Sequence, residues 1–113
     1  MIVIYHNPMC KKSRESLEIL ETKKADHTVI KYMDETLSPE KLGKIIKLLK
    51  IKPIELVRQD ETVWKENFKD LDFTDDELIE VMAKYPVLIE RPIVINGDKA
   101  VIGRPPTKIL DIL

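Results

Sequence analysis

The first 32 residues constrain the fold most, because they switch from a strand pattern to a helix pattern and back. Residues 1–5 (MIVIY) and 28–32 (TVIKY) are short apolar runs rich in β-branched side chains, which is typical of strands. Residues 10–24 lie between them with helical spacing, and Leu17 and Leu20 are expected on the buried face. This order predicts a βαβ unit, with parallel strands joined by a right-handed crossover.

The end of the chain returns to a period of two. Residues 92–95 are predicted to form a strand, and Asn96 with Gly97 is the strongest short signal for a type I′ hairpin turn. Residues 99–102 then lead back antiparallel, and residues 107–113 are predicted to form a last helix. The inward side chains of that helix are expected to be Ile109 and Leu110.

Residues 38–85 are predicted to form a helical block between these two parts. Ser38 is expected to cap one helix, with a proline directly after it, and Thr74 with Glu77 forms a capping box at the start of another. Their apolar stripes are Leu42, Ile45, Ile46 and Leu49, and Leu78, Ile79 and Met82. Shorter helical segments are expected at residues 53–58 and 62–68.

The elements add up to βαβ, a helical insertion and ββα. Without the insertion, this is the thioredoxin-like α/β arrangement, a mixed four-stranded sheet with helices on its faces. Since no flexible linker flanks the insertion, residues 1–113 are expected to be one domain. The catalytic position of this layout is the loop after the first strand, where Cys10 lies.

Composition excludes several functional classes. The formal net charge of −1 gives no field that would attract nucleic acid or an anionic membrane. No apolar stretch approaches the roughly 18 residues of a membrane span, and the N-terminus lacks the basic start of a signal peptide. A single cysteine excludes an internal disulfide framework, so we expect a monomer in the reducing cytoplasm.

Cys10 has the setting of a reactive thiol. It stands at the expected start of a helix, where free N–H groups and the helix dipole favour an anion. Lys11, Lys12 and Arg14 follow it and make the surroundings electropositive. These conditions lower the pKa of a thiol below its usual value of about 8.5.

The neighbours of Cys10 narrow the chemistry. Ser13 stands where a two-cysteine redox motif has its second thiol, so it could donate a hydrogen bond to the thiolate or be an ordinary helix residue. His6 and Cys10 provide too few ligands for a zinc site, so no metal is expected. A phosphatase loop would need arginine at position 16, which is serine. His6 could tune the thiolate or brace the loop, and bracing is the favoured interpretation.

Three further arginines lie in connections, and arginine suits bidentate binding of oxyanions. Arg91 precedes Pro92 at the head of the third strand, and in a thioredoxin-like layout this X-Pro bond lies opposite the cysteine and is typically cis. Arg104 lies between a glycine and two prolines, which limit its backbone. Arg58 lies in the helical block, and spacing alone does not bring it to the site.

Four stretches of the chain are jointly specific for one family. They are HNPMCKKSRE at residues 6–15, LVR at 56–58, ERPIV at 90–94 and GRP at 103–105. With them the chain resembles the glutaredoxin-dependent arsenate reductases, and the resemblance extends to the C-terminal ILDIL.

The resemblance implies a mechanism. Cys10 would attack arsenate and form a covalent thiol–arsenate adduct, and glutathione as co-substrate would attack this adduct. Glutaredoxin would recycle the mixed disulfide, and no bound cofactor is implied. The residues implied to bind the oxyanion are Arg58, Arg91 and Arg104, while His6 and Arg14 would tune the cysteine and its loop.

Two other functions remain open at this point. One is a regulatory module like the related Spx proteins, which bind RNA polymerase and usually carry a second cysteine where this chain has Ser13. The other is a general glutathione-linked thiol transferase, in which the arginines would bind glutathione carboxylates.

Overall fold

The computed structural model describes residues 2–113, and the chain forms two compact units. The first unit consists of Met1–Glu35 and Arg91–Leu113, and the second of Thr36–Glu90. The second unit contains the helical block that the sequence predicts. The expectation of one domain over residues 1–113 stays a prediction.

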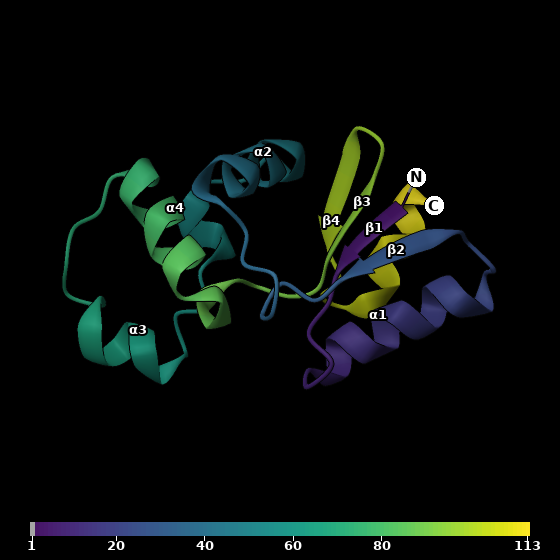
Figure 1. Ribbon diagram of the computed structural model, residues 1–113, viewed down its shortest axis with the longest axis horizontal. Helices are drawn as coiled ribbons and strands as arrows, with labels where there is room; N and C mark the ends of the chain where they lie inside the picture. Colours follow the sequence, from purple (N-terminus) through teal and green to yellow (C-terminus); the bar gives the residue numbers. More distant parts are fainter. Residues whose placement is uncertain (1) are drawn as a thin grey trace. The chain divides into compact units, whose positions relative to one another are not determined.

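The first unit is built on a four-stranded mixed sheet in the order β2-β1-β3-β4 (Figure 1). β1 (Ile2–Tyr5) pairs parallel with β2 (His27–Ile30) and antiparallel with β3 (Ile93–Asn96), and β3 pairs antiparallel with β4 (Lys99–Ile102). Gly97 has φ 64°, as a type I′ turn requires. This is the predicted thioredoxin-like sheet.

The register of the sheet brings three connections together at one edge. Tyr5, at the end of β1, pairs with Ile93 at the start of β3, and Ile93 pairs with Ile102 at the end of β4. The loop that leads to Cys10 therefore leaves the sheet beside the segment before β3 and the segment after β4.

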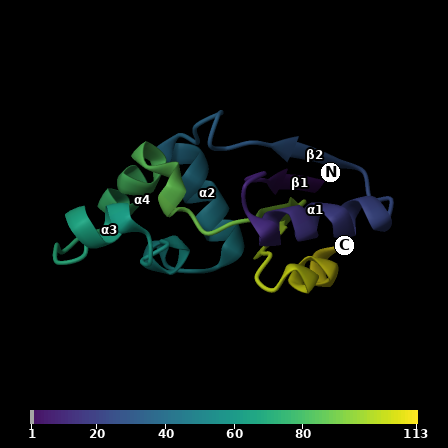
Figure 2. The same cartoon turned by 90° about the horizontal axis from the view of Figure 1, so that it is seen from below.

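Helix α1 (Lys11–Thr22) and the 3₁₀ helix η3 (Pro106–Ile112) cover the same face of the sheet (Figure 2). Each aliphatic side chain that is buried there stabilises the unit by about 1.5–3 kcal/mol. The buried core consists of Ile2, Ile4, Leu20, Val94, Ile109 and Ile112, and Leu17 packs against it half-buried.

The prediction for the last helix is wrong at one residue. Leu110, expected to point inward, is 43 % exposed, whereas Ile109 and Ile112 are buried. The helix is a 3₁₀ helix with three residues per turn, so residues i and i+3 share a face. Ile109 and Ile112 therefore take the inward positions.

The second predicted strand is shorter than expected. β2 ends at Ile30, whose carbonyl accepts from the His6 N–H at 2.8 Å, and the next backbone hydrogen bonds join Asp34 and Glu35 to the Lys31 carbonyl. The chain thus turns away from the sheet directly after Ile30. The first predicted strand included Met1, which lies outside the described residues.

The second unit is helical, with α2 (Pro39–Leu49), α3 (Thr62–Asn67) and α4 (Asp75–Lys84). Ser38 Oγ accepts from the Lys41 N–H at 3.1 Å, which confirms the predicted cap of α2. The remaining elements are the 3₁₀ helices η1 (Pro53–Leu56) and η2 (Pro86–Leu88) and an isolated antiparallel bridge between Val57 and Ile89.

The capping box of α4 is also confirmed. The Glu77 N–H donates to Thr74 Oγ1 at 3.2 Å, and the Thr74 N–H donates to Glu77 Oε1 at 2.8 Å. Among the described residues, no helix is long and apolar enough to cross a membrane.

Candidate active site

Cys10 is the N-cap residue of α1, in an extended backbone conformation. Its N–H donates to the Asn7 carbonyl at 3.0 Å, and its carbonyl accepts from the Arg14 N–H at 3.0 Å. The residue is buried, with 8 % of its surface exposed. The loop and the first turn of the helix therefore fix the position of the sulfur.

The Ser13 hydroxyl braces the loop before Cys10. Its Oγ lies 2.5 Å from His6 Nδ1 and accepts from the Asn7 N–H at 3.0 Å, and all three side chains are buried. The side chain of Ser13 is thus engaged with the loop, and Ser13 acts on Cys10 through its backbone N–H.

The outer side of the loop is held by two further contacts. The Met9 N–H donates to Asn7 Oδ1 at 3.0 Å, and Arg14 Nη1 donates to the Pro8 carbonyl at 2.8 Å. Arg14 therefore contacts the loop backbone. Met9, directly before Cys10, is 88 % exposed, so an apolar side chain stands in solvent beside the thiol.

Two arginines come to the sulfur from the same edge of the sheet. Arg104 Nη2 donates to Cys10 Sγ at 3.9 Å, and Arg104 Nε donates to the Arg91 carbonyl at 2.8 Å. The Arg91 side chain also hydrogen-bonds the thiol. The Arg91–Pro92 peptide bond is cis, as predicted, and the Arg104–Pro105 bond is cis as well.

These surroundings lower the pKa of the Cys10 thiol below its ordinary value. Burial has the largest single effect and raises the pKa. The Ser13 N–H, the hydrogen bond and charge of Arg91, and the Lys12 N–H together outweigh it. Because each of these groups favours the charged form, the site stabilises a thiolate.

The surroundings of His6 favour its neutral form by lowering its pKa. Its pKa is lowered first by burial, then by the positive charges of Lys31 and Arg14, while the contact with Ser13 opposes the shift. A neutral imidazole can both donate and accept, which suits the hydrogen bond to the Ser13 hydroxyl.

Arg58 belongs to the second unit. Its Nε lies 3.1 Å from Glu61 Oε1, its Nη1 lies 3.8 Å from Glu90 Oε2, and its N–H donates to the Leu88 carbonyl at 2.7 Å. It is therefore paired with two carboxylates of its own unit. Its expected part in binding an oxyanion at Cys10 stays a prediction.

The structure brings together most of the residues singled out in the sequence, and it adds two. Asn7 organises the loop through three polar contacts, and the asparagine–proline pair, a common turn signal, was the clue to it. Gly103, which directly precedes Arg104, packs against Pro92, which directly follows Arg91, and no local sequence pattern indicated this contact.

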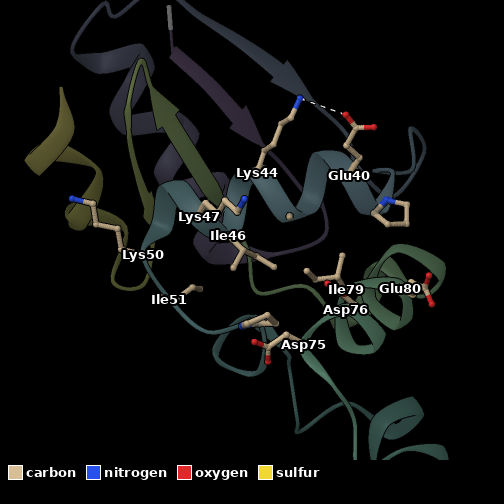
Figure 3. Close-up of a pocket in the computed structure, with 13 residues that line it drawn as sticks. Glu40, Lys44, Ile46, Lys47, Lys50, Ile51, Asp75, Asp76, Ile79 and Glu80 are labelled. Atoms are coloured by element: carbon tan, nitrogen blue, oxygen red, sulfur yellow. Dashed lines mark ion pairs between the residues drawn. The ribbon is translucent and has the colours of Figure 1, made fainter.

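A groove of about 680 Å³ lies within the second unit (Figure 3). Ile46, Ile51 and Ile79 contribute apolar side chains to it, and Lys44 pairs with Glu40 at 3.6 Å on the exposed side of α2. Its lining contains neither a cysteine nor an arginine. Within residues 2–113, no group of three or more His, Cys, Asp and Glu side chains could hold a metal ion.

Comparisons with known proteins identify the family. The model of the ArsC family matches residues 5–112 of this chain. An arsenate reductase of Haemophilus influenzae is 43 % identical over 99 % of this chain and 98 % of its own, and the uncharacterized protein YfgD of Escherichia coli is 40 % identical over 99 % and 96 %. The solved structure of an arsenate reductase from Vibrio cholerae has a TM-score of 0.94 at 43 % identity, covering 99 % of this chain and 97 % of that chain. The chain therefore belongs to the ArsC family.

Proposed function

We propose that this protein is an arsenate reductase that uses Cys10 as its nucleophile. The observation that carries the proposal is the buried Cys10 thiol, whose pKa is lowered and whose sulfur is contacted by Arg91 and Arg104. Its relatives in Haemophilus influenzae and Vibrio cholerae bear the name arsenate reductase, which supports the same substrate.

In the first step, the Cys10 thiolate attacks the arsenic atom of arsenate. A sulfur–arsenic bond forms, and a hydroxyl group of the arsenate takes up a proton and leaves as water. Arg91 and Arg104 suit this step, because their guanidinium groups can bind the oxyanion while they stabilise the thiolate. We assign a third oxyanion contact to Arg58.

The second step needs a thiol from outside the chain, because Cys10 is its only cysteine. A glutathione thiolate attacks the adduct, and a disulfide forms between Cys10 and glutathione. The two sulfurs are thereby oxidised, and arsenic takes up two electrons and leaves as arsenite. Glutaredoxin with further glutathione then restores the Cys10 thiol.

His6, Ser13 and Arg14 hold the loop during these steps. The Ser13 hydroxyl joins the His6 ring to the Asn7 backbone, and Arg14 holds the Pro8 carbonyl. We propose that the protein works as a monomer in the cytoplasm, where glutathione is available.

A coupled assay tests the proposal. Arsenate-dependent oxidation of NADPH is followed with glutathione, glutathione reductase and purified glutaredoxin. We expect turnover only when both glutathione and glutaredoxin are present, and none with Cys10→Ser. No arsenate-dependent oxidation by the folded, unaltered protein would overturn the proposal.

Two further measurements separate this function from the alternatives. Equal turnover of a simple glutathione mixed disulfide, without any preference for arsenate, would indicate a general thiol transferase. Capture of RNA polymerase that persists in Cys10→Ser, together with no arsenate turnover, would indicate a regulator.

A further inference from the structure

Gly103 lies in a space where any side chain would force a neighbour to shift. A Cβ atom added to it would lie 2.6 Å from Ser16 Oγ and 2.8 Å from Pro92 Cγ. The proline ring is rigid and Ser16 is fully buried, so neither neighbour can yield easily. Gly103 thus makes the closest contact that its backbone permits with both α1 and the residue before β3.

This contact lies beside the two arginines that reach the sulfur, one residue from each of them along the chain. Gly103 directly precedes Arg104, and Pro92 directly follows Arg91. The Gly103 N–H donates to the Pro92 carbonyl at 2.9 Å, and Arg104 Nε donates to the Arg91 carbonyl at 2.8 Å. The two segments are therefore joined by two hydrogen bonds and by the packing of glycine on proline.

Ser16 forms the third side of this contact, from α1. It lies six residues after Cys10 on the helix that Cys10 caps. Its hydroxyl is buried and has no hydrogen-bond partner among the described residues. The contribution of Ser16 is therefore its small size, which lets α1 approach Gly103 closely.

We propose that Gly103 and Ser16 are positioning residues that set how closely Arg91 and Arg104 approach the Cys10 sulfur. They fix the separation between α1, which carries the sulfur, and the paired segments that carry the guanidinium groups. A larger side chain at either position moves the arginines away from the sulfur.

The test is the pH dependence of Cys10 alkylation by iodoacetamide in Gly103→Ala. With the arginines displaced, we expect the inflection to move to higher pH and the alkylation rate below it to fall by a factor of about 10, the equivalent of one pKa unit. A glycine with a purely structural role would lower the thermal midpoint and leave this inflection unchanged.

Gly43→Ala is the matched control. It makes the same substitution in α2, where the nearest atom to the added Cβ is Ile79 Cδ1 at an ordinary 3.9 Å. This variant is expected to keep the alkylation profile of the unaltered protein. The double variant Gly103→Ala/Ser16→Ala removes the oxygen nearest to the new methyl group, so it should recover part of the lost reactivity.

The catalytic purpose of this positioning rests on the proposed function, but the alkylation experiment tests the positioning independently of that function. Alkylation needs no arsenate, so a protein inactive on arsenate can still show the shift. A folded Gly103→Ala with an unchanged inflection would overturn the inference. If Gly103→Ala does not fold, Ser16→Thr adds one methyl group from the other side, and an unchanged inflection in that variant has the same meaning.

Discussion

At the head of a helix, burial favours the neutral form of a thiol, whereas the neighbouring groups favour its charged form. At Cys10 the neighbours prevail, because backbone N–H groups of α1 and the Arg91 side chain point at the sulfur. His6 in the loop and Ser13 in the first turn of α1 contact each other and keep the sulfur within reach of these groups. Two predictions concern these individual side chains.

Removing one guanidinium should make Cys10 less reactive. Arg104→Met deletes the contact at 3.9 Å, so we expect the inflection of Cys10 alkylation to move to higher pH. Lys108→Met removes one positive charge from an exposed position of the same unit and is the matched control. Equal profiles for both variants would mean that Arg104 does not stabilise the thiolate.

The stability of the protein should fall as the pH drops below about 6.5. The pKa of His6 is lowered in the folded state, so the unfolded chain binds more protons in this range. Its contribution is complete above the unfolded pKa and is lost as the pH falls through the folded pKa. Thermal midpoints at pH 7.5 and 5 measure the effect, and His6→Gln should reduce the difference between them.

At the scale of helices and strands, the sequence predicts what local chemistry determines. The caps at Ser38 and Thr74 and the turn at Gly97 were predicted because a few adjacent residues specify each of them. The end of β2 at Ile30 was not, because it depends on where the distant partner strand β1 ends, at Tyr5. Leu110 was misplaced because the pattern does not distinguish a 3₁₀ helix from an α-helix.

Helix α2 carries a glycine that can be replaced with a gain in stability. Gly43→Ala should raise the free energy of unfolding by about 0.8–1 kcal/mol, because alanine loses less backbone entropy in a helix and fits here without crowding. Chemical denaturation measures this gain. Gly97→Ala should act in the opposite direction, since φ at Gly97 is 64°. A loss of stability in Gly43→Ala would contradict the prediction.

At the scale of the whole molecule, the candidate site depends on the register of the sheet. Cys10 was predicted from its immediate neighbours, whereas Arg91 and Arg104 were predicted only through the inferred fold and the family resemblance. The pairings of Tyr5 with Ile93 and of Ile93 with Ile102 explain why they meet. The direction of the Ser13 side chain could not be predicted. The His6 ring and the Asn7 N–H compete with the Cys10 sulfur for the hydrogen bond of its hydroxyl group.

The first turn of α1 contains no acidic residue, although a helix usually gains stability from a negative charge there. The Cys10 thiolate fills that place, so the charge that makes the site reactive also supports the helix. Chemistry and folding are therefore coupled, and a neutral modification of the sulfur removes a stabilising charge. Protein alkylated at Cys10 with iodoacetamide should unfold at a lower temperature than unmodified protein at pH 8, and Cys10→Ser treated with the same reagent should show no change. The resting enzyme would then be more stable than any form in which its sulfur is capped without charge.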